Sequence, residues 1–333
     1  SKLGTRSAAK PRPYQEPTLR QSLIQLLNTV LPFIGLWLLM LAALPYSYGV
    51  TLLLAFPAAG LLVRLFIIQH DCGHSSFFRS QKANDVLGFV LGVLTLTPYV
   101  YWRRAHNAHH KSSGNLDHRT FGEIRMLTVQ EYLSRSPWQR FCYRLYRHPL
   151  VLFVVGPLYQ FGLKHRLPIG IPKTWKREWA GVMWTNLCLL GIILTMWKTI
   201  GLQAFLMVHL PVMFISSAIG VWLFYIQHQF EDTYWRKDPE WNFHHAGLEG
   251  SSYYALPAVL QWFTGNIGVH HVHHLSVGIP NYLLQRCFRE NPELQHVTKL
   301  TLLGSLKCAR LKLWDEQKRV LVTFRDLDSR HVA

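Results

Sequence analysis

Long apolar stretches alternate with polar segments along this chain, and four of them contain almost no charged residues. A helix that crosses a lipid bilayer needs about 20 predominantly apolar residues. The predicted membrane spans are about 27–45, 50–69, 180–198 and 202–226. The connections at 45–49 and 198–201 are very short, so the four helices should form two hairpins.

Composition supports a membrane protein and indicates its orientation. Only 16% of the 333 residues are charged, against about 25% in typical soluble domains. The region 70–177 contains 16 lysines and arginines but only 5 aspartates and glutamates. Such basic segments lie on the cytoplasmic side of a membrane. We therefore expect both termini and a cap formed by 70–177 and 227–333 in the cytosol, with 1–333 as one domain. The polar, basic first 20 residues do not predict a cleavable signal peptide.

Nine histidines occur in three clusters, whose sequences HDCGH, HNAHH and HHVHH begin at positions 70, 106 and 270. Residues three and four apart share one face of a helix, and histidine is the commonest metal ligand. The candidate metal ligands on such helix faces are His70, His74, His106, His109, His110, His270, His273 and His274. Eight ligands exceed the four of a tetrahedral zinc ion, so the pattern predicts two metal ions of higher coordination number.

In the predicted topology, the histidine clusters lie at the same depth, on the cytosolic side of the membrane. The second span ends just before His70 and His74, which continue the same helix into the cytosol. The fourth span runs back toward the cytosol and ends at Ile226, so His228 should emerge beside the first cluster. We therefore predict His228 as a ninth ligand.

Two further apolar segments need a different interpretation. If 86–101 crossed the membrane, the first two histidine clusters would lie on opposite faces and could not share a metal centre. Its Gly88, Gly92 and Pro98 fit an interfacial or re-entrant helix instead. The segment 150–163 is shorter and flanked by basic residues, which is typical of a helix lying in the interface. The expected fold is an all-α membrane protein whose cytosolic helical cap holds a di-metal site.

Metal-binding imidazoles need hydrogen-bond acceptors that fix their orientation. The carboxylates near the predicted ligands are those of Asp71, Asp117, Glu231 and Asp232. His271 follows His270 directly and should point about 100° away from the ligand face, toward a supporting or surface position. The adjacent pair His244 and His245 lacks partners at helical spacing, so we expect no metal there. No catalytic residue beyond the metal ligands is predicted.

The three clusters, in this order and between two apolar hairpins, resemble the histidine boxes of the membrane fatty acid desaturases. The resemblance covers about 30–290. The sequence GNIGVHHVHHL at 265–275 and the Ile-Pro-Asn-Tyr at 279–282 are similar to bacterial acyl-lipid desaturases of the delta-12/omega-6 type. This resemblance implies a bacterial cytoplasmic membrane as the location and oxygen-dependent insertion of a cis double bond into a lipid acyl chain as the activity.

The resemblance also implies a non-haem di-iron centre, molecular oxygen as co-substrate, and the nine histidines as ligands. Some relatives carry an additional Asn ligand one turn before the position of His228. Phe224 occupies that position here, so no such ligand is expected. The chain has no His-Pro-Gly-Gly pattern of a fused cytochrome. Electrons should therefore come from a separate protein such as a ferredoxin, whose acidic surface would suit a net charge of +17.

Other functions remain open from sequence alone. A hydroxylase or ketolase of the same superfamily would use the same ligands. A haem- or metal-binding membrane transport protein is a non-enzymatic alternative, but haem ligation would need histidine pairs inside the spans. Only His209 lies in the middle of a span. Nucleic acid is not an expected partner, and the oligomeric state is not predicted.

Overall fold

The computed structural model describes residues 14–119 and 123–328, and most of them are helical. Four helices are long and apolar enough to cross a membrane, which confirms the four predicted spans. They are α1 (Leu19–Ala43), α2 (Tyr48–Gly73), α8 (Lys176–Ile200) and α9 (Leu202–His228). The first helix begins earlier than predicted because the Thr18 side chain caps it by accepting a hydrogen bond from the Gln21 backbone N–H.

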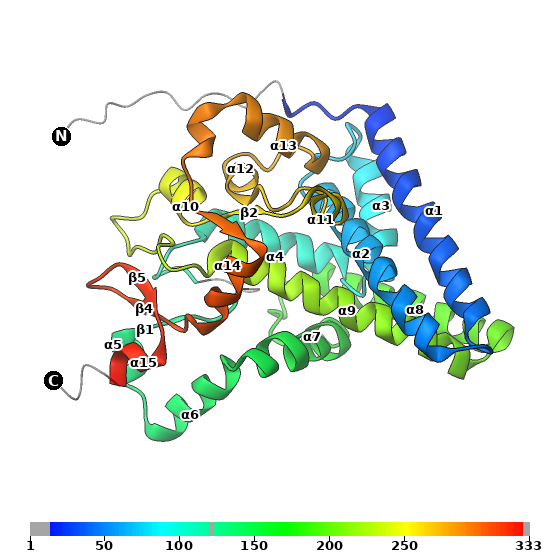
Figure 1. Cartoon of the computed structure of the whole chain (residues 1–333), viewed down its shortest axis with the longest axis horizontal. Helices are drawn as coiled ribbons and strands as arrows, with labels where there is room; N and C mark the ends of the chain where they lie inside the picture. Colours follow the sequence, from blue (N-terminus) through cyan, green and yellow to red (C-terminus); the bar gives the residue numbers. More distant parts are fainter. Residues whose placement is uncertain (1–13, 120–122, 329–333) are drawn as a thin grey trace.

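The spanning helices form two hairpins whose turns lie at the same end of the molecule (Figure 1). Gly201 joins α8 to α9 with a positive φ of 84°, a conformation that glycine adopts without steric cost. The Tyr48 hydroxyl at the start of α2 donates a hydrogen bond to the Met207 carbonyl near the start of α9. The opposite ends of α2 and α9 therefore also lie together, and these ends carry histidines.

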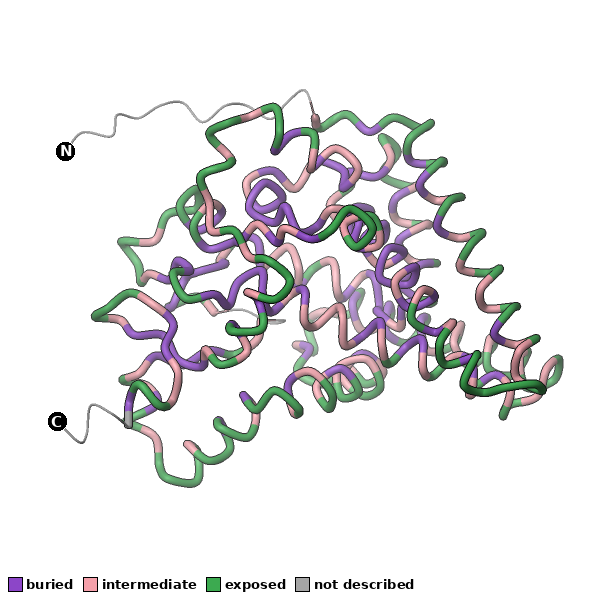
Figure 2. The backbone as a smooth tube through the Cα atoms, in the orientation of Figure 1, coloured by how far each residue is buried: buried purple, intermediate pink, exposed green. Residues whose placement is uncertain are grey.

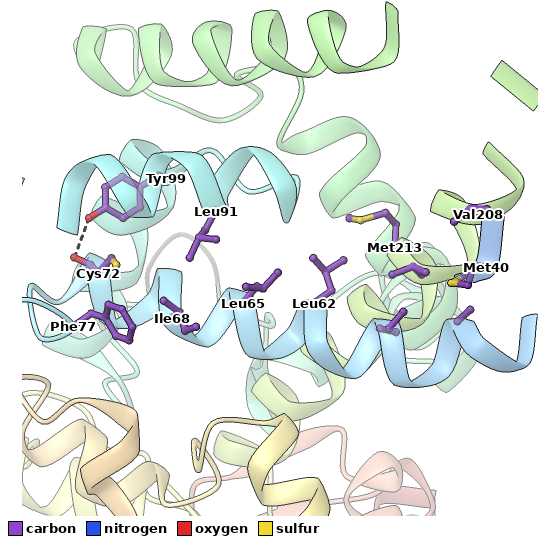
Figure 3. Close-up of a cluster of buried hydrophobic side chains, with 14 residues drawn as sticks. Met40, Leu62, Leu65, Ile68, Cys72, Phe77, Leu91, Tyr99, Val208 and Met213 are labelled. Atoms are coloured by element: carbon purple, nitrogen blue, oxygen red, sulfur yellow. Dashed lines mark hydrogen bonds between the residues drawn. The ribbon is translucent and has the colours of Figure 1, made fainter. Parts of the chain in front are cut away.

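Helix α2 is the centre of the packing, as Figure 2 shows by its largely buried tube. Leu62, Leu65 and Ile68 of this helix are almost fully buried and pack with Met40 of α1 and Met213 of α9 (Figure 3). The outward sides of the spanning helices differ, because large apolar side chains lie exposed on them. Exposed apolar surface of this extent indicates contact with lipid.

Helices α3 (Gln81–Leu94) and α4 (Tyr99–Ser112) form a bent pair with an angle of 104° between them. Gly92 permits the bend, because a Cβ atom there would lie 2.6 Å from the Thr97 carbonyl oxygen. The Tyr99 hydroxyl ties the start of α4 to the Cys72 carbonyl of α2 (Figure 3). The predicted interfacial or re-entrant segment 86–101 thus spans two helices joined by a sharp bend, as in a broken span or a re-entrant loop.

The apolar segment after 150 is a continuous helix with α and π turns, namely η2 (Val151–Val155), α7 (Gly156–Tyr159) and η3 (Gln160–Lys164). Phe153 packs edge-on against Trp222 and Tyr225 of α9. The opposite side of the segment exposes large apolar side chains, as expected for a helix in the membrane interface.

The cap is built from short helices and small sheets at the histidine-bearing ends of α2 and α9 (Figure 1). Its helices are α5 (Val129–Leu133), α6 (Pro137–Tyr146), α10 (Phe243–Glu249), α11 (Ala258–Phe263), α12 (His270–Leu275), α13 (Asn281–Glu290), η4 (Pro292–Gln295), α14 (Leu302–Ser305), η5 (Leu306–Arg310) and α15 (Phe324–Asp328). Its strands are β1 (Leu127–Thr128), β2 (Tyr253–Ala255), β3 (Lys299–Thr301), β4 (Leu313–Asp315) and β5 (Val320–Val322).

The structure contains two small β-sheets in addition to the predicted helices. One has the order β1-β4-β5, with β1 parallel and β5 antiparallel to β4, and the other pairs β2 with β3 in parallel. In the first sheet Leu313 pairs with Leu127 on one side and with Val322 on the other. Strands of two or three residues carry no detectable alternation of polar and apolar positions, so the sequence did not reveal them.

Candidate metal centre

Nine histidine side chains converge where α2, α4, α9 and α12 meet, and they form two groups that could each hold a metal ion. Within each group the potential ligand atoms lie within 4.8 Å of one another. The five-histidine cluster contains His70, His74, His106, His110 and His273. The four-histidine cluster contains His109, His228, His270 and His274. These are the nine residues predicted from sequence, and the structure brings all of them together.

Hydrogen bonds define how the four-histidine cluster faces its centre. The His109 Nδ1–H donates to the Glu123 carboxylate at 3.1 Å, and the His228 Nδ1–H donates to the Gly250 carbonyl at 3.0 Å. In a neutral imidazole the other nitrogen then carries a lone pair. The two Nε2 atoms of His109 and His228 lie 3.1 Å apart. Two lone pairs at that distance repel each other unless a cation lies between them.

The spacing of the Nε2 atoms fits a common metal ion. His270 Nε2 lies 3.0 Å from His228 Nε2 and 3.1 Å from His274 Nε2. Ligand nitrogens at about 2.1 Å from a metal and at right angles to one another are separated by about 3.0 Å, and by about 3.4 Å at tetrahedral angles. The four-histidine cluster therefore has the donor set and geometry of a metal site.

The five-histidine cluster repeats this geometry. His110 Nε2 lies 3.1 Å from both His106 Nε2 and His273 Nε2. The rings of His70 and His74 lie 4.5 and 4.9 Å from the ring of His273. The indole of Trp102 stacks on His106 at 4.5 Å and covers its outer face.

Burial keeps the imidazoles of α12 in the form that binds metal. Desolvation, reinforced by the neighbouring histidines, holds the pKa values of His270, His273 and His274 well below the usual range. These rings are therefore neutral at pH 7, and a neutral imidazole nitrogen is a metal donor. A bound cation would lower these pKa values further, because its charge opposes protonation.

A buried polar network stands behind His70. The Asp71 carboxylate lies 3.2 Å from His70 Nδ1 and accepts hydrogen bonds from the backbone and side-chain N–H groups of Asn281 at 2.6 and 2.8 Å. The Asn281 side chain in turn exchanges hydrogen bonds with Gln25 of α1. The network connects a candidate ligand to the first spanning helix and to the start of α13.

The other predicted supporting residues lie elsewhere. Asp117 accepts from the Asp238 backbone N–H, and Asp232 accepts from the Thr298 hydroxyl. The exposed Glu231 contributes its backbone carbonyl to Leu321 N–H. The structure records no contact of these three carboxylates with the nine histidines. They follow their ligands closely in sequence but leave the site because the chain turns away after α4 and α9.

His271 has a structural position. Its ring is fully buried, not at the surface, and its Nε2 lies 2.9 Å from the Leu294 carbonyl oxygen. His244 and His245 lie exposed on α10, outside both clusters, and His245 pairs with Glu249. Phe224 packs against the rings of His109 and His228 at 5.2 and 5.6 Å, so an apolar side chain borders the four-histidine cluster.

Sequence reasoning missed Glu123 and Trp102. Trp102 lies one helical turn before His106, so the i, i+4 spacing was a usable signal. Glu123 lies 14 positions after His109 in a segment without regular structure. Nothing in the local pattern distinguishes it from an ordinary surface carboxylate.

A largely apolar cavity of about 370 Å³ borders both clusters. His70 and His106 of one cluster and His109 and His270 of the other line it. Most of its remaining wall comes from α2, α4, α9 and the helical segment 151–164. An elongated apolar molecule could therefore lie with part of its length beside both potential metal positions.

Comparison with known proteins assigns the chain to a family. Residues 44–301 match the model of the family described as fatty acid desaturase. The chain belongs to this family. The family assignment made from the histidine boxes is thus confirmed, and the protein is an oxidoreductase.

Several curated relatives of this desaturase cover most of its length. A "Fatty acid desaturase" of Bacillus subtilis is 46% identical over 94% of this chain and 88% of its own. An "sn-1 acyl-lipid omega-3 desaturase (ferredoxin)" of Nostoc is 26% identical over 85% of this chain and 78% of its own. An "sn-1 oleoyl-lipid 12-desaturase" of Anabaena variabilis is 26% identical over 79% and 73%, respectively.

Proposed function

We propose that this desaturase inserts a cis double bond into an acyl chain of a membrane lipid at a non-haem di-iron centre held by the nine histidines. One observation carries the proposal. The apolar cavity has imidazoles of both clusters in its wall, so a bound hydrocarbon chain would lie next to both metal positions. The site lies at the ends of the spanning helices, where a membrane lipid can present its chain.

Removal of hydrogen from an unactivated methylene group exceeds the chemistry of any side chain. Two iron ions with open coordination positions would supply the oxidising power when oxygen is present. The overall reaction converts one CH2–CH2 unit, O2, two electrons and two protons into a CH=CH unit and two water molecules. The protein must therefore hold the chain, exclude water and admit electrons.

The residues of the cavity perform the first two of these tasks. Phe66 and Trp102 pack edge to face at 5.4 Å in the wall beside His70 and His106. Leu223 and Phe224 line the wall beside His109. These rigid apolar surfaces would fix one stretch of the chain in place, which lowers the entropic part of the barrier. They also exclude water from a site where reactive species must survive.

The remaining residues orient the donors. The Asp71 and Glu123 carboxylates and the Gly250 carbonyl accept hydrogen bonds from the Nδ1 atoms of His70, His109 and His228. Each contact directs the Nε2 lone pair toward the cluster and makes the imidazole a better donor. Three of the nine rings are thereby held before any metal binds.

We further propose that a separate ferredoxin-like protein supplies the electrons from the cytosol of a bacterium. The name of the Nostoc relative specifies ferredoxin. The net charge of +17 would attract an acidic carrier and raise its rate of encounter. The basic segments from which we infer a cytosolic cap would serve the same purpose.

The delta-12 position is the most specific part of the proposal. Relatives of similar identity are named as 12-desaturases and omega-3 desaturases, and the name of the Anabaena relative specifies an oleoyl chain, which already contains one double bond. We therefore expect the substrate to be an acyl chain that already contains one cis double bond.

The test is expression of the full chain in a bacterial host that receives either stearate or oleate, followed by mass spectrometry of the total lipids. New dienes from oleoyl lipids support the proposal. A hydroxylated or keto product, or a new double bond only in saturated chains, rejects it. A His273→Ala variant at matched expression serves as the inactive control.

A further inference from the structure

The cavity is mainly apolar, and its described lining contains one carboxylic acid side chain, Glu123, and one lysine, Lys164. Glu123 lies at the histidine end, where it contacts His109. Lys164 is the last residue of η3, at the end of the apolar helical segment 151–164. A lysine in the wall of an apolar cavity is unfavourable unless its ammonium group has a polar partner, because desolvation of that group is costly.

The neighbours of Lys164 in sequence have protein partners. The His165 Nδ1–H donates to the Leu96 carbonyl at 3.2 Å. The Arg166 guanidinium donates to the same carbonyl at 2.6 Å and to the Asn186 side chain at 2.9 Å. Lys164 forms no hydrogen bond or ion pair with the described residues. Of these three consecutive basic residues, Lys164 is the one whose side chain has no hydrogen-bond partner among the described residues, and it lines the cavity together with His165.

The surroundings of Lys164 indicate what could satisfy it. Burial lowers the pKa of its ammonium group, so an anion beside it would restore a stable positive charge. On the outer side of the same helix, Leu158 and Leu163 are more than half exposed, as expected of side chains that face lipid. A partner must therefore combine an anionic group with an apolar chain.

We propose that Lys164 binds the anionic group of the amphiphile whose acyl chain lies in the cavity, either the phosphate of a phospholipid or the carboxylate of a free fatty acid. This inference rests on the proposed function only in taking an acyl chain as the occupant. Anchoring at Lys164 would set how far the chain enters the cavity. The lysine would thereby help to determine which carbon atoms lie beside His70 and His270.

The experiment measures binding without turnover, with the full-length protein in detergent micelles and displacement of radiolabelled oleate as the readout. Two pairs of competitors differ in one charge each. Oleate is compared with methyl oleate, and dioleoylphosphatidylglycerol is compared with dioleoylglycerol. The variants are Lys164→Gln, Lys164→Arg and, as a matched control, Lys173→Gln, which changes an exposed lysine outside the cavity.

The wild-type protein should prefer the anionic member of at least one pair by roughly tenfold or more, the typical value of a charge-assisted hydrogen bond. Lys164→Gln should remove that preference, Lys164→Arg should retain most of it, and Lys173→Gln should leave it unchanged. The pair that shows the preference identifies carboxylate or phosphate as the ligand.

Absence of any preference in the wild-type protein overturns the inference, and so does a preference that survives Lys164→Gln or falls equally in Lys173→Gln. Because no product is formed in this assay, its outcome is independent of the reaction. A protein that shows the Lys164-dependent preference but makes no alkene would contradict the proposed function and leave the anchor intact.

Discussion

Six of the nine imidazoles fall into two kinds that differ in the hydrogen bonding of Nδ1. His70, His109 and His228 each have an acceptor for Nδ1. The buried Nδ1 atoms of His110, His270 and His273 have no partner among the described residues. Rings of the first kind are oriented by hydrogen bonds, whereas rings of the second kind depend on packing and on the metal itself. Removal of metal should therefore loosen α12 more than the end of α2.

Substitution of one ligand should have a large effect. His273→Ala removes the one member of the five-histidine cluster that comes from α12. We expect loss of metal and more than about 100-fold lower turnover, since loss of a mere supporting contact typically costs 10–100-fold. Metal analysis of the purified protein and product formation at matched expression measure both effects.

The matched control is His244→Ala, at an exposed position on α10 outside both clusters. It should keep the metal content and most of the turnover. Equal losses in the two variants would contradict the assignment of ligands made here.

A buried histidine outside the clusters predicts a pH effect on stability. Burial lowers the pKa of His165 to about 3, whereas an unfolded chain has a histidine pKa of about 6.5. Between these values only the unfolded state binds the proton, so the free energy of unfolding decreases as the pH falls from about 6.5 toward 3. The limiting slope is about 1.4 kcal/mol per pH unit.

His165→Gln should flatten this part of the profile, because glutamine does not titrate. The measurement is the midpoint of thermal unfolding in detergent between pH 7 and pH 4 for both proteins. Other buried histidines contribute equally to both profiles, so the difference in slope isolates His165. Parallel profiles would show that its proton binding does not differ between the folded and unfolded states.

Candidate site residues could be predicted from sequence where their spacing along a helix was informative. The i, i+3 and i+4 pattern selected eight of the nine histidines of the boxes as candidate ligands, and the topology added His228. Glu123 could not be found in this way, because its contact with His109 depends on the path of a loop. Asp117 was assigned by proximity in sequence alone, and the structure places it against Asp238 instead.

At the scale of elements, α4 and α12 each contribute histidines to both clusters. Helix α4 gives His106 and His110 to one cluster and His109 to the other, while α12 gives His273 to one and His270 and His274 to the other. Side chains on adjacent rows of one helix lie a few ångströms apart. The helices themselves therefore fix the separation of the two metal positions.

The bend between α3 and α4 should be sensitive to a single methyl group. Gly92→Ala would place a Cβ atom 2.6 Å from the Thr97 carbonyl oxygen, and relief of such overlap costs about 1–3 kcal/mol. We expect a lower unfolding midpoint and less bound metal, because α4 carries three of the candidate ligands. Thermal unfolding and metal analysis of the purified variant test this.

Gly191→Ala is the control for the bend, since nothing lies within 4 Å of the added methyl group on α8. Its unfolding midpoint and metal content should match or exceed those of the wild-type protein. A Gly92→Ala protein that behaves like this control would show that the bend tolerates a side chain.

The bend between α3 and α4 is a case in which the positions of the histidine clusters were more informative than local hydropathy. Hydropathy alone allowed a fifth span at 86–101, and the main argument against it was the need to keep two histidine clusters on one side of the membrane. The short strands offered no comparable constraint. Their pairing of β1 with β4 joins residues far apart in sequence, which a local pattern does not report.

At the scale of the whole molecule, the cap should face the cytosol. Cys142 on α6 is the exposed cysteine of the cap, and the other cysteines within 70–177 and 227–333, Cys72, Cys287 and Cys308, are buried. A membrane-impermeant maleimide should therefore label the protein in inverted membrane vesicles and not in right-side-out vesicles. Cys142→Ser should abolish this labelling. Labelling in right-side-out vesicles would reverse the proposed orientation.

The division of ligands along the chain has a consequence for biosynthesis. Four members of the five-histidine cluster precede position 111, whereas three members of the four-histidine cluster follow position 227. A growing polypeptide thus exposes most of one centre long before it exposes most of the other. Neither set is complete until the six residues of α12 leave the ribosome and dock. Insertion of metal into both proposed centres would therefore be completed by one step, the docking of α12.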